Sequence, residues 1–397
     1  MKKKFIWVIF IISVLFLFCF IFYKLNQNKN NNKKVIVLFN WGEYIDPSII
    51  NEYNQQSNQF IIKQSFFSSN ELAINKIKSG NQYDIAILSE YAIEQLKEHN
   101  LEEIDWSQLQ QTPLSYNLSF KDFIEKKIDN ENTKISKYTI PYFWGNLGFL
   151  YNTNRISLNE LINNKWVNLI KNPKFRVALY NNAFEGIFIG LKATNGNISV
   201  NSEEEIQKAK DWLINLKKQN INLSFITDQL LDRMRIKDNE YYDIAVSYSG
   251  DARFLMKQNP NLGYYSFNDD RNDEESKNKG TNIWFDGIVL PKNSNKKGAY
   301  DFIKFILQED NRKKNNEFIG YDSPYDVDDE EQKDERRLTI NLKKEDKIYK
   351  YNETYKKQIS EAWNQVYAYP DPKDKNLIIL IFIILFLFVL IYIFFRQ

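Results

Sequence analysis

Two uncharged apolar runs near the ends of this 397-residue chain constrain its folding more than any other feature. FIWVIFIISVLFLFCFIFY occupies residues 5–23, and LIILIFIILFLFVLIYIFF occupies residues 377–395. At about 1.5 Å per residue, a helix of either run is about long enough to cross a bilayer core of roughly 30 Å. We therefore predict two transmembrane helices that flank a polar middle region.

The first run is predicted to remain uncleaved. It is longer than the apolar core of a signal peptide, which has roughly 7–15 residues, and no small-x-small cleavage site follows it. Cys19 is preceded by Phe18, which is too bulky for a lipoprotein cleavage site. The run is therefore expected to stay on the chain as an anchor.

The basic residues at the N-terminus predict the orientation of the chain. Lys2, Lys3 and Lys4 precede the first run, and such a cluster favours the cytoplasmic side of a membrane. Two spans then place both termini in the cytoplasm and the middle region outside the cell, held at the cell membrane. Lys33, Lys34, Lys373 and Lys375 on the outer flanks weaken this preference.

Composition excludes several classes of function. The chain has 53 basic and 51 acidic residues, and without the basic residues at 2, 3, 4, 24 and 396 the remainder is slightly acidic. A nucleic-acid binder would instead carry a basic patch or stripe. With one cysteine (Cys19) and one histidine (His99), zinc clusters, catalytic triads and Cys–His pairs are excluded. We expect no cofactor, no metal and no enzymatic activity.

The middle region alternates strand-like and helix-like segments. VIVLFN, FIIKQSF and YDIAIL are separated by helical patterns, one of which begins at Asp46-Pro47, an N-cap followed by proline at the first helical position. A β-α-β-α-β order predicts a parallel sheet. A looser repeat follows from FRVALY to YDFIKFIL, which predicts a second α/β lobe. The charge-rich segment 322–347 is expected to be a solvated loop.

Acidic and aromatic residues recur where the predicted strands end. The stretch NWGEY follows the first strand, and similar pairs follow FRVALY and DIAVSYS and occur in NIWFDG. In open α/β sheets, ligands bind beyond the carboxyl ends of the strands. A carboxylate between aromatic rings suits a cation that has an apolar body. Each pair alone is weak evidence, since a strand-end tryptophan is usually core and an aspartate after a strand is usually a helix cap.

The motifs NWGEYIDPS, YDIAILSEY, TIPYFWG, IWFDGIVLPKNS and FIGYDSPY, in this order, resemble the spermidine/putrescine-binding proteins of ABC importers. These proteins are two-lobed periplasmic binding proteins. The resemblance runs from about residue 35 to about residue 369. It implies an α/β fold with a ligand cleft between two lobes, here flanked by transmembrane helices.

The resulting division follows the two anchors and this resemblance. The parts are an anchor at 5–23, an Asn-rich tether at 24–34, lobe 1 at 35–141 and 285–320, lobe 2 at 142–284 and 321–369, a tether at 370–376, and an anchor at 377–395.

The resemblance also implies which residues contact the ligand. Carboxylates of this family hold the ammonium groups of a polyamine, and aromatic rings cover its methylene chain. The positions that match are Trp41, Glu43, Tyr44, Ser89, Tyr91, Asn182, Glu185, Tyr248, Trp284, Asp286 and Tyr321.

Two of these positions depart from the family pattern. Asn182 stands where the family often has aspartate, and Tyr248 stands where it often has tryptophan. A lost carboxylate weakens the hold on a charged ligand, because charge-assisted hydrogen bonds are the stronger ones. Glu90 and Asp251 are nearby acids that are expected to compensate.

Several alternatives remain open from sequence. Paired carboxylates perform acid–base chemistry in glycosidases, but no nucleophile–base pair is evident here. Tyr241-Tyr242 is a pair of the kind that a ferric-ion receptor uses. The chain is also compatible with a receptor for another cationic ligand or with a surface protein that does not serve transport. For the favoured function, the partners are a polyamine, the membrane, and a permease with an ATPase on separate chains.

Overall fold

The computed structural model describes residues 33–370 with short gaps, together with residues 384 and 386. The gaps are residues 111, 113, 115–119, 122–133, 164, 197–199, 201, 227–228, 239, 268–279, 326–345 and 349–352. The predicted spans at 5–23 and 377–395 lie outside the described residues, apart from those two positions, as does most of both tethers. Within the described part of the chain, no helix combines the length and the apolar character needed to cross a membrane.

The described residues form two compact units, each built from discontinuous segments. Unit 1 takes the described residues up to 114, Ile135–Ile140 and Gly287–Phe318; unit 2 takes Pro141–Asp286 and the described residues from 319 onward. Three of the five boundaries between the units, after residues 140, 286 and 318, lie within two residues of the expected lobe boundaries. Phe120 belongs to unit 2, contrary to expectation, because its ring packs against Trp144 at 5.2 Å and Phe285 at 6.2 Å.

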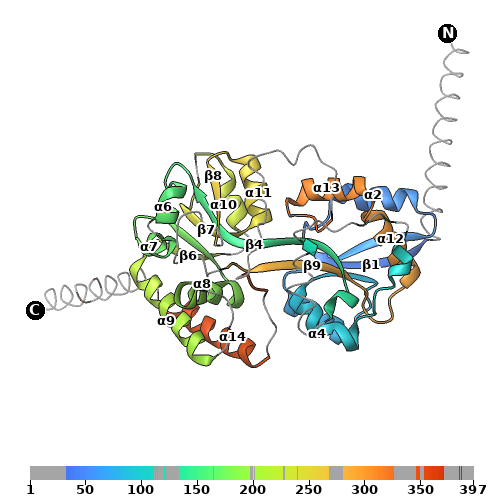
Figure 1. The fold of residues 1–397 in the computed structure, drawn as a ribbon, viewed down its shortest axis with the longest axis horizontal. Coiled ribbons are helices and arrows are strands. Elements are labelled where there is room, and N and C mark those ends of the chain that lie inside the picture. The colour runs from blue at the N-terminus through green and yellow to red at the C-terminus, as the bar shows by residue number, and fades with distance from the viewer. Residues whose placement is uncertain are drawn as a thin grey trace, which may run out of the picture. The chain divides into compact units, whose positions relative to one another are not determined.

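Unit 1 contains a parallel sheet with helices on both faces, as the alternating pattern predicted. The strand order is β2-β1-β3, followed by β9, and both β2 and β3 run parallel to β1. In Figure 1, α2 and α13 lie on one face of this sheet and α4 lies on the other. The elements are β1 (Lys34–Trp41), α2 (Pro47–Gln56), β2 (Phe60–Phe67), α3 (Asn70–Lys78), β3 (Ile85–Ser89), α4 (Glu90–Asn100), η1 (Trp106–Leu109), η4 (Ile135–Lys137), α12 (Lys296–Ile306) and α13 (Glu309–Ile319).

Local sequence signals fix these elements. The Asp46 side chain accepts a hydrogen bond from the Ser48 amide at 2.8 Å and so caps α2, with Pro47 in the first turn as predicted. The Asp84 carboxylate accepts the Val37 amide at 2.8 Å and the Asn295 amide at 2.7 Å. Asp84 thus joins β1 to the start of α12. Lys34, expected in the tether, is the first residue of β1.

Unit 2 is the predicted second α/β lobe, and its sheet is mixed. The order is β8-β4-β7-β5-β6; β5 is parallel to β6 and β7, whereas β4 is antiparallel to β7 and β8. The 13-residue strand β4 was not predicted as a strand, because every one of its residues is buried and its apolar run shows no alternation. The elements are β4 (Ile140–Asn152), α6 (Leu158–Asn163), α7 (Trp166–Lys171), β5 (Val177–Tyr180), α8 (Ala183–Asn195), α9 (Glu203–Gln219), β6 (Leu223–Ile226), α10 (Gln229–Arg235), β7 (Ile244–Tyr248), α11 (Ser249–Gln258), β8 (Leu262–Ser266), β9 (Ile283–Val289) and α14 (Glu353–Ala368).

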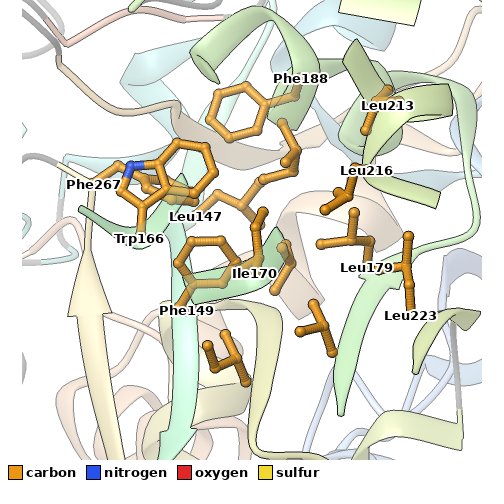
Figure 2. Close-up of a cluster of buried hydrophobic side chains, with 14 of the residues drawn as sticks. Leu147, Phe149, Trp166, Ile170, Leu179, Phe188, Leu213, Leu216, Leu223 and Phe267 are labelled. Atoms are coloured by element: carbon orange, nitrogen blue, oxygen red, sulfur yellow. The ribbon is translucent and has the colours of Figure 1, made fainter. Parts of the chain in front are cut away.

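Both faces of this mixed sheet are covered by helices. Figure 1 shows α8, α9 and α14 on one face and α10 and α11 on the other. Figure 2 shows the larger core, in which Phe149 and Leu179 of the sheet pack with Trp166, Leu213 and Phe267. On the other face, Leu150, Ala178 and Ala245 pack with Leu255. Successive residues of each strand therefore serve opposite faces, as the strand period of two requires.

Residues 326–345 of the charged segment 322–347 lie outside the described residues, so the expectation of a solvated loop stays a prediction, but two residues near the ends of the segment are buried. Asp346 is 1% exposed and accepts the Thr281 amide at 2.7 Å. Tyr325 is 3% exposed, and its hydroxyl donates to the Pro141 carbonyl at 2.9 Å. These two contacts fasten the segment to unit 2 at both of its ends.

Gly186 provides a test of how α8 packs against α14. A Cβ atom built at Gly186 would lie 2.1 Å from the ring of Trp363. We therefore predict that Gly186→Ala destabilises the chain by about 1–3 kcal/mol, because added volume in a packed core strains it. Urea denaturation in detergent measures the loss.

Gly42→Ala is the matched control for this prediction, since no atom lies within 4 Å of a Cβ at that position. It should change stability by less than about 0.5 kcal/mol, the range of surface substitutions. Equal effects of the two substitutions would contradict the packing described here.

Candidate functional site

Four aromatic side chains form a continuous row in unit 2. Tyr180 and Tyr248 stack at 5.5 Å, Tyr248 meets Trp284 edge to face at 5.5 Å, and Trp284 meets Tyr321 edge to face at 5.0 Å. Trp284 and Tyr321 are 9% and 8% exposed. Edge-to-face and offset pairs at these separations are the arrangements that aromatic quadrupoles favour. The row brings together three predicted site residues and adds Tyr180.

The chain carries these rings on different kinds of element. Tyr180 and Tyr248 are the last residues of β5 and β7, as the strand-end argument predicted. Trp284 and Asp286 lie inside β9 rather than at its carboxyl end. They are two residues apart and so point to the same face of that strand.

Two glycines allow the rings to approach the backbone. A Cβ at Gly145 would lie 2.7 Å from the ring of Trp284, and one at Gly250 would lie 2.0 Å from the ring of Tyr321. Any other residue at these positions would displace the ring above it. The glycine of the TIPYFWG motif therefore has a packing role beneath the indole.

Glu185 is joined to the aromatic row through a hydrogen bond. Its carboxylate accepts the Tyr248 hydroxyl. Glu185 lies in the first turn of α8, and Asn182 caps that helix by accepting the Glu185 amide at 3.0 Å. Asn182 is exposed, and its side-chain oxygen is used as the cap. Asparagine and aspartate cap helices about equally well, so this departure from the family pattern leaves Glu185 in place.

Asp251 is the second acid at the row. Burial raises the pKa of its carboxyl to about 6, and a hydrogen bond from the Tyr321 hydroxyl offsets part of that rise. Burial also raises the pKa of the Tyr180 and Tyr321 hydroxyls well above the ordinary value, and the charge of Asp251 adds to it. The two phenols therefore remain protonated donors at neutral pH beside a carboxylate that is mostly ionised.

An ion pair secures the segment that carries Tyr321. Arg253 of α11 donates to the Gly320 carbonyl at 2.6 Å and pairs with Asp322 at 2.9 Å. Both side chains are largely buried. Gly320 and Asp322, which flank Tyr321, are thus fixed to α11, and the first turn of that helix contains Asp251.

In unit 1, the motif NWGEY lies at the carboxyl end of β1. Trp41 is the last residue of that strand, and its ring packs on Phe67 at 4.5 Å. Glu43 is exposed and has a φ of 54°, a conformation that residues other than glycine rarely adopt. Such outliers gather at ligand sites, which favours a functional reason for this one. Tyr44 is buried, at 8% exposed.

The second unit 1 motif, SEY, lies where β3 passes into α4. Asn70 at the start of α3 donates to the Ser89 hydroxyl and the Tyr91 hydroxyl, both at 3.0 Å. The Tyr91 hydroxyl also donates to Glu71 at 3.3 Å. β1 and β3 are parallel, so Ser89 and Trp41 lie at the same edge of the sheet. Glu90, proposed as a compensating acid, is 3% exposed.

Sequence analysis missed several residues of these two groups. Tyr180 ends the predicted strand FRVALY just as Tyr248 ends its own strand. Its strand-end position therefore indicated a site residue, although it was not predicted as one. Asn70 and Glu71 look like an ordinary helix start, and nothing in the sequence alone joins them to Ser89 and Tyr91. Their contribution depends on the tertiary structure.

The Tyr241-Tyr242 pair lacks the surroundings of a ferric site. Tyr242 is 2% exposed within the core, whereas Tyr241 is 50% exposed. The guanidinium groups of Arg233 and Arg176 lie 4.7 Å and 5.7 Å from the Tyr241 ring, which disfavours a trivalent cation. The part of the chain that the structure describes also contains no group of three His, Cys, Asp or Glu residues able to hold a metal.

Comparisons with known proteins show which proteins the chain resembles. Residues 1–184 match the profile of a family described as hypothetical lipoprotein (MG045 family). The spermidine/putrescine-binding periplasmic protein of Escherichia coli K12 is 25% identical over 300 residues, 73% of this chain and 77% of that protein. The putrescine-binding periplasmic protein SpuD of Pseudomonas aeruginosa is 22% identical over 290 residues, 69% of this chain and 74% of that protein.

Solved structures show the same fold. A putative spermidine/putrescine ABC transporter protein from Listeria monocytogenes is 27% identical, with a TM-score of 0.69, over 85% of this chain and all of that one. The corresponding substrate-binding protein of Streptococcus pneumoniae is 25% identical, with a TM-score of 0.66, over 85% and 99%.

The chain therefore has the α/β fold of the two-lobed periplasmic binding proteins. Among these, the predicted resemblance to the spermidine/putrescine-binding proteins of ABC transporters is confirmed by curated homologues and structural neighbours alike. The names of these proteins describe a periplasmic binding protein and a putative ABC transporter, and neither name is that of an enzyme.

The burial of Asp251 predicts a pH-dependent effect on stability. Its folded pKa of about 6 lies above that of an exposed aspartate, so its ionised form destabilises the folded state. This cost builds up between about pH 4, where the unfolded chain loses the proton, and about pH 6, and it is fully present above that. Asp251→Asn removes the cost. In ligand-free buffer, the melting temperature of the variant relative to the original chain should be higher near pH 8 than near pH 5. An equal difference at both pH values would contradict this.

Proposed function

We propose that this chain binds a polyamine of the spermidine/putrescine class. The observation that carries the proposal is the row Tyr248–Trp284–Tyr321 with acids beside it. Glu185 accepts from Tyr248, Asp251 accepts from Tyr321, and the charge of Asp286 also acts on Tyr321. A polyamine has ammonium groups separated by methylene chains. Carboxylates hold the ammonium groups, and aromatic faces cover the methylene chains. Each aromatic face adds roughly 0.5–2 kcal/mol of attraction to a nearby ammonium group.

The proposal assigns matching roles to the unit 1 residues. Glu43 supplies a further carboxylate, and Trp41 and Tyr44 supply apolar surface. Ser89 and Tyr91, held together by Asn70, supply hydroxyl groups. Support comes from their position at the carboxyl edge of a parallel sheet, where α/β proteins bind ligands.

The names of the homologues support the same ligand class. Those listed above are named for binding spermidine and putrescine, or putrescine. We infer that the chain delivers its ligand to the permease of an ABC transporter whose ATPase is a separate chain. The five acids Glu43, Glu90, Glu185, Asp251 and Asp286 match a ligand with several positive charges better than a ferric ion, which prefers grouped oxygen ligands.

Membrane attachment completes the proposed function. The runs at 5–23 and 377–395 hold the middle region outside the cell and close to a permease. A tethered receptor cannot diffuse away from the membrane. Its effective concentration at the permease is therefore high, which raises the rate at which receptor and permease meet.

Loss of one carboxylate should weaken polyamine binding selectively. Asp286→Asn and Glu43→Gln are each expected to reduce the affinity for spermidine about 10- to 100-fold, because each removes a charge-assisted hydrogen bond of roughly 1.5–3 kcal/mol. Calorimetric titration of the full chain in detergent measures the change.

Asp211→Asn in unit 2 and Glu98→Gln in unit 1 are matched controls, since both remove an exposed acid outside the two groups of site residues. They should leave the affinity within about twofold of the original. Unchanged affinity in Asp286→Asn and Glu43→Gln alike would rule out the proposed site.

The compensation hypothesis has its own test. If Asp251 replaces the carboxylate missing at Asn182, Asp251→Asn should weaken spermidine binding at neutral pH. Below pH 6 the original chain should lose affinity as Asp251 gains a proton, and the variant should lose less. Titrations near pH 5 and near pH 7.5 compare the two. Full affinity in Asp251→Asn and in Glu90→Gln would contradict the hypothesis.

The mass of the membrane-extracted chain tests whether the N-terminal anchor is cleaved. The proposal of an uncleaved span predicts that the membrane-extracted chain keeps its first 18 residues and an unmodified Cys19. The family description as a lipoprotein names the competing outcome, a chain that begins at an acylated Cys19. Intact-mass spectrometry distinguishes the two by the lost residues and the added lipid.

A further inference from the structure

The amino edge of the unit 2 sheet, opposite the edge that carries Tyr180 and Tyr248, gathers cationic and aromatic residues. β5, β6 and β7 are parallel, so the residues before each of them lie at this edge. They include Lys174, Ile221 and Tyr241. α9 ends beside β6 with Lys218, and the Tyr241 amide binds the Arg233 carbonyl at the end of α10.

The end of α14 and the residues up to Pro370 join the same edge. Lys217 of α9 donates to the carbonyl oxygens of Val366 at 3.2 Å and Tyr367 at 3.0 Å, and so caps the end of α14. The ammonium group of Lys218 lies 5.2 Å from the ring of Tyr369. These residues are therefore fixed against this surface.

A hollow of about 540 Å³ runs along the edge strand β6 and reaches Arg233 and Tyr241. The described residues that line it include cations and aromatics and no carboxylate; Lys217, Arg233, Tyr241, Tyr367 and Tyr369 are among them. Asp232 and Asp238 are exposed near Arg233, and Asp243 is buried against Arg176 at 3.1 Å.

The surface has the composition of a membrane interface. Tyr241 is 50% exposed, Tyr367 is 53% exposed and Ile221 is 43% exposed, while Lys174, Lys218 and Arg233 are also exposed. Tyrosine prefers the headgroup region of a bilayer, and lysine and arginine attract anionic lipids at roughly 1 kcal/mol each.

The chain itself brings a bilayer close to this surface. Six residues separate Pro370, which lines the hollow, from the apolar run that begins at residue 377. Six extended residues reach at most about 21 Å. If that run spans the membrane, the hollow cannot lie far from the headgroups.

We infer that this edge of unit 2 docks on the headgroups of anionic phospholipids, with the hollow around Arg233 and Tyr241 receiving a lipid phosphate. The inference rests on the proposed C-terminal anchor. Docking would hold unit 2 by its amino edge and leave its carboxyl edge, which carries the aromatic row, directed away from the lipid.

A spin label tests the inference in the full chain. The label is placed at Gln219→Cys, next to Lys218, in a Cys19→Ala background, and the protein is inserted into nanodiscs. Accessibility to a water-soluble nickel complex should be at least about threefold lower in phosphatidylglycerol than in phosphatidylcholine. Salt at about 0.5 M should remove most of the difference by screening.

Two controls isolate the cause. A label at Glu204→Cys, near the start of α9 and about 22 Å away along that helix, should stay accessible in both lipids. Lys218→Gln with Arg233→Gln should abolish the lipid dependence at Gln219→Cys. Lys297→Gln with Lys304→Gln, which removes two exposed charges from unit 1, should preserve it.

The outcomes separate this inference from the proposed function. Equal accessibility in both lipids, in protein that enters nanodiscs and binds spermidine, overturns the docking surface alone. Protein that fails to enter nanodiscs overturns the anchor and the inference with it. Lipid dependence that persists in Lys218→Gln/Arg233→Gln also overturns the assignment to this surface.

Discussion

The indole of Trp284, packed edge to face between Tyr248 and Tyr321, is the contact on which the candidate site depends. It is possible because Gly145 and Gly250 leave room for the rings and because Arg253 fixes the segment around Tyr321. The acids gain their character from this packing. Asp251 has a raised pKa because aromatic rings remove it from water, and Glu185 is oriented by the hydroxyl of Tyr248.

The mixed sheet of unit 2 gives its two edges different chemistry. Strands β5 and β7 end in tyrosines beside acids, whereas the exposed residues that precede these strands include Lys174 and Tyr241, and the acids Glu240 and Asp243 at that edge are buried. Although the net charge of the chain is small, the exposed charges at these two edges therefore differ in sign. One edge suits a cation with an apolar chain, and the other suits an anionic surface.

Sequence predicted most of unit 1 because its signals are local. Asp46-Pro47 marks the start of a helix, and short β-branched runs alternate with segments of helical period. This pattern predicts which segments are strands and which are helices, and it predicts that the strands are parallel. The fully buried strand β4 escaped because it lacks alternation, and the mixed sheet of unit 2 depends on that strand. Apolar runs without a period do not reveal strand direction.

The candidate site was predictable in its residue types and less so in its geometry. Tyr248 was expected at a strand end and lies there, whereas Trp284 and Asp286 lie within β9. Asn182 caps the helix that carries Glu185, and its expected effect on ligand affinity stays a prediction. Tyr180, Asn70 and Glu71 act through partners distant in sequence, which no local pattern reveals.

A crystal structure of the chain grown with spermidine tests the central claim most directly. The account predicts a methylene chain against the Trp284 ring and amine nitrogens within about 2.7–3.1 Å of the carboxylates of Asp286 and Glu185. Spermidine bound elsewhere, with Trp284 and Asp286 uncontacted, would contradict it.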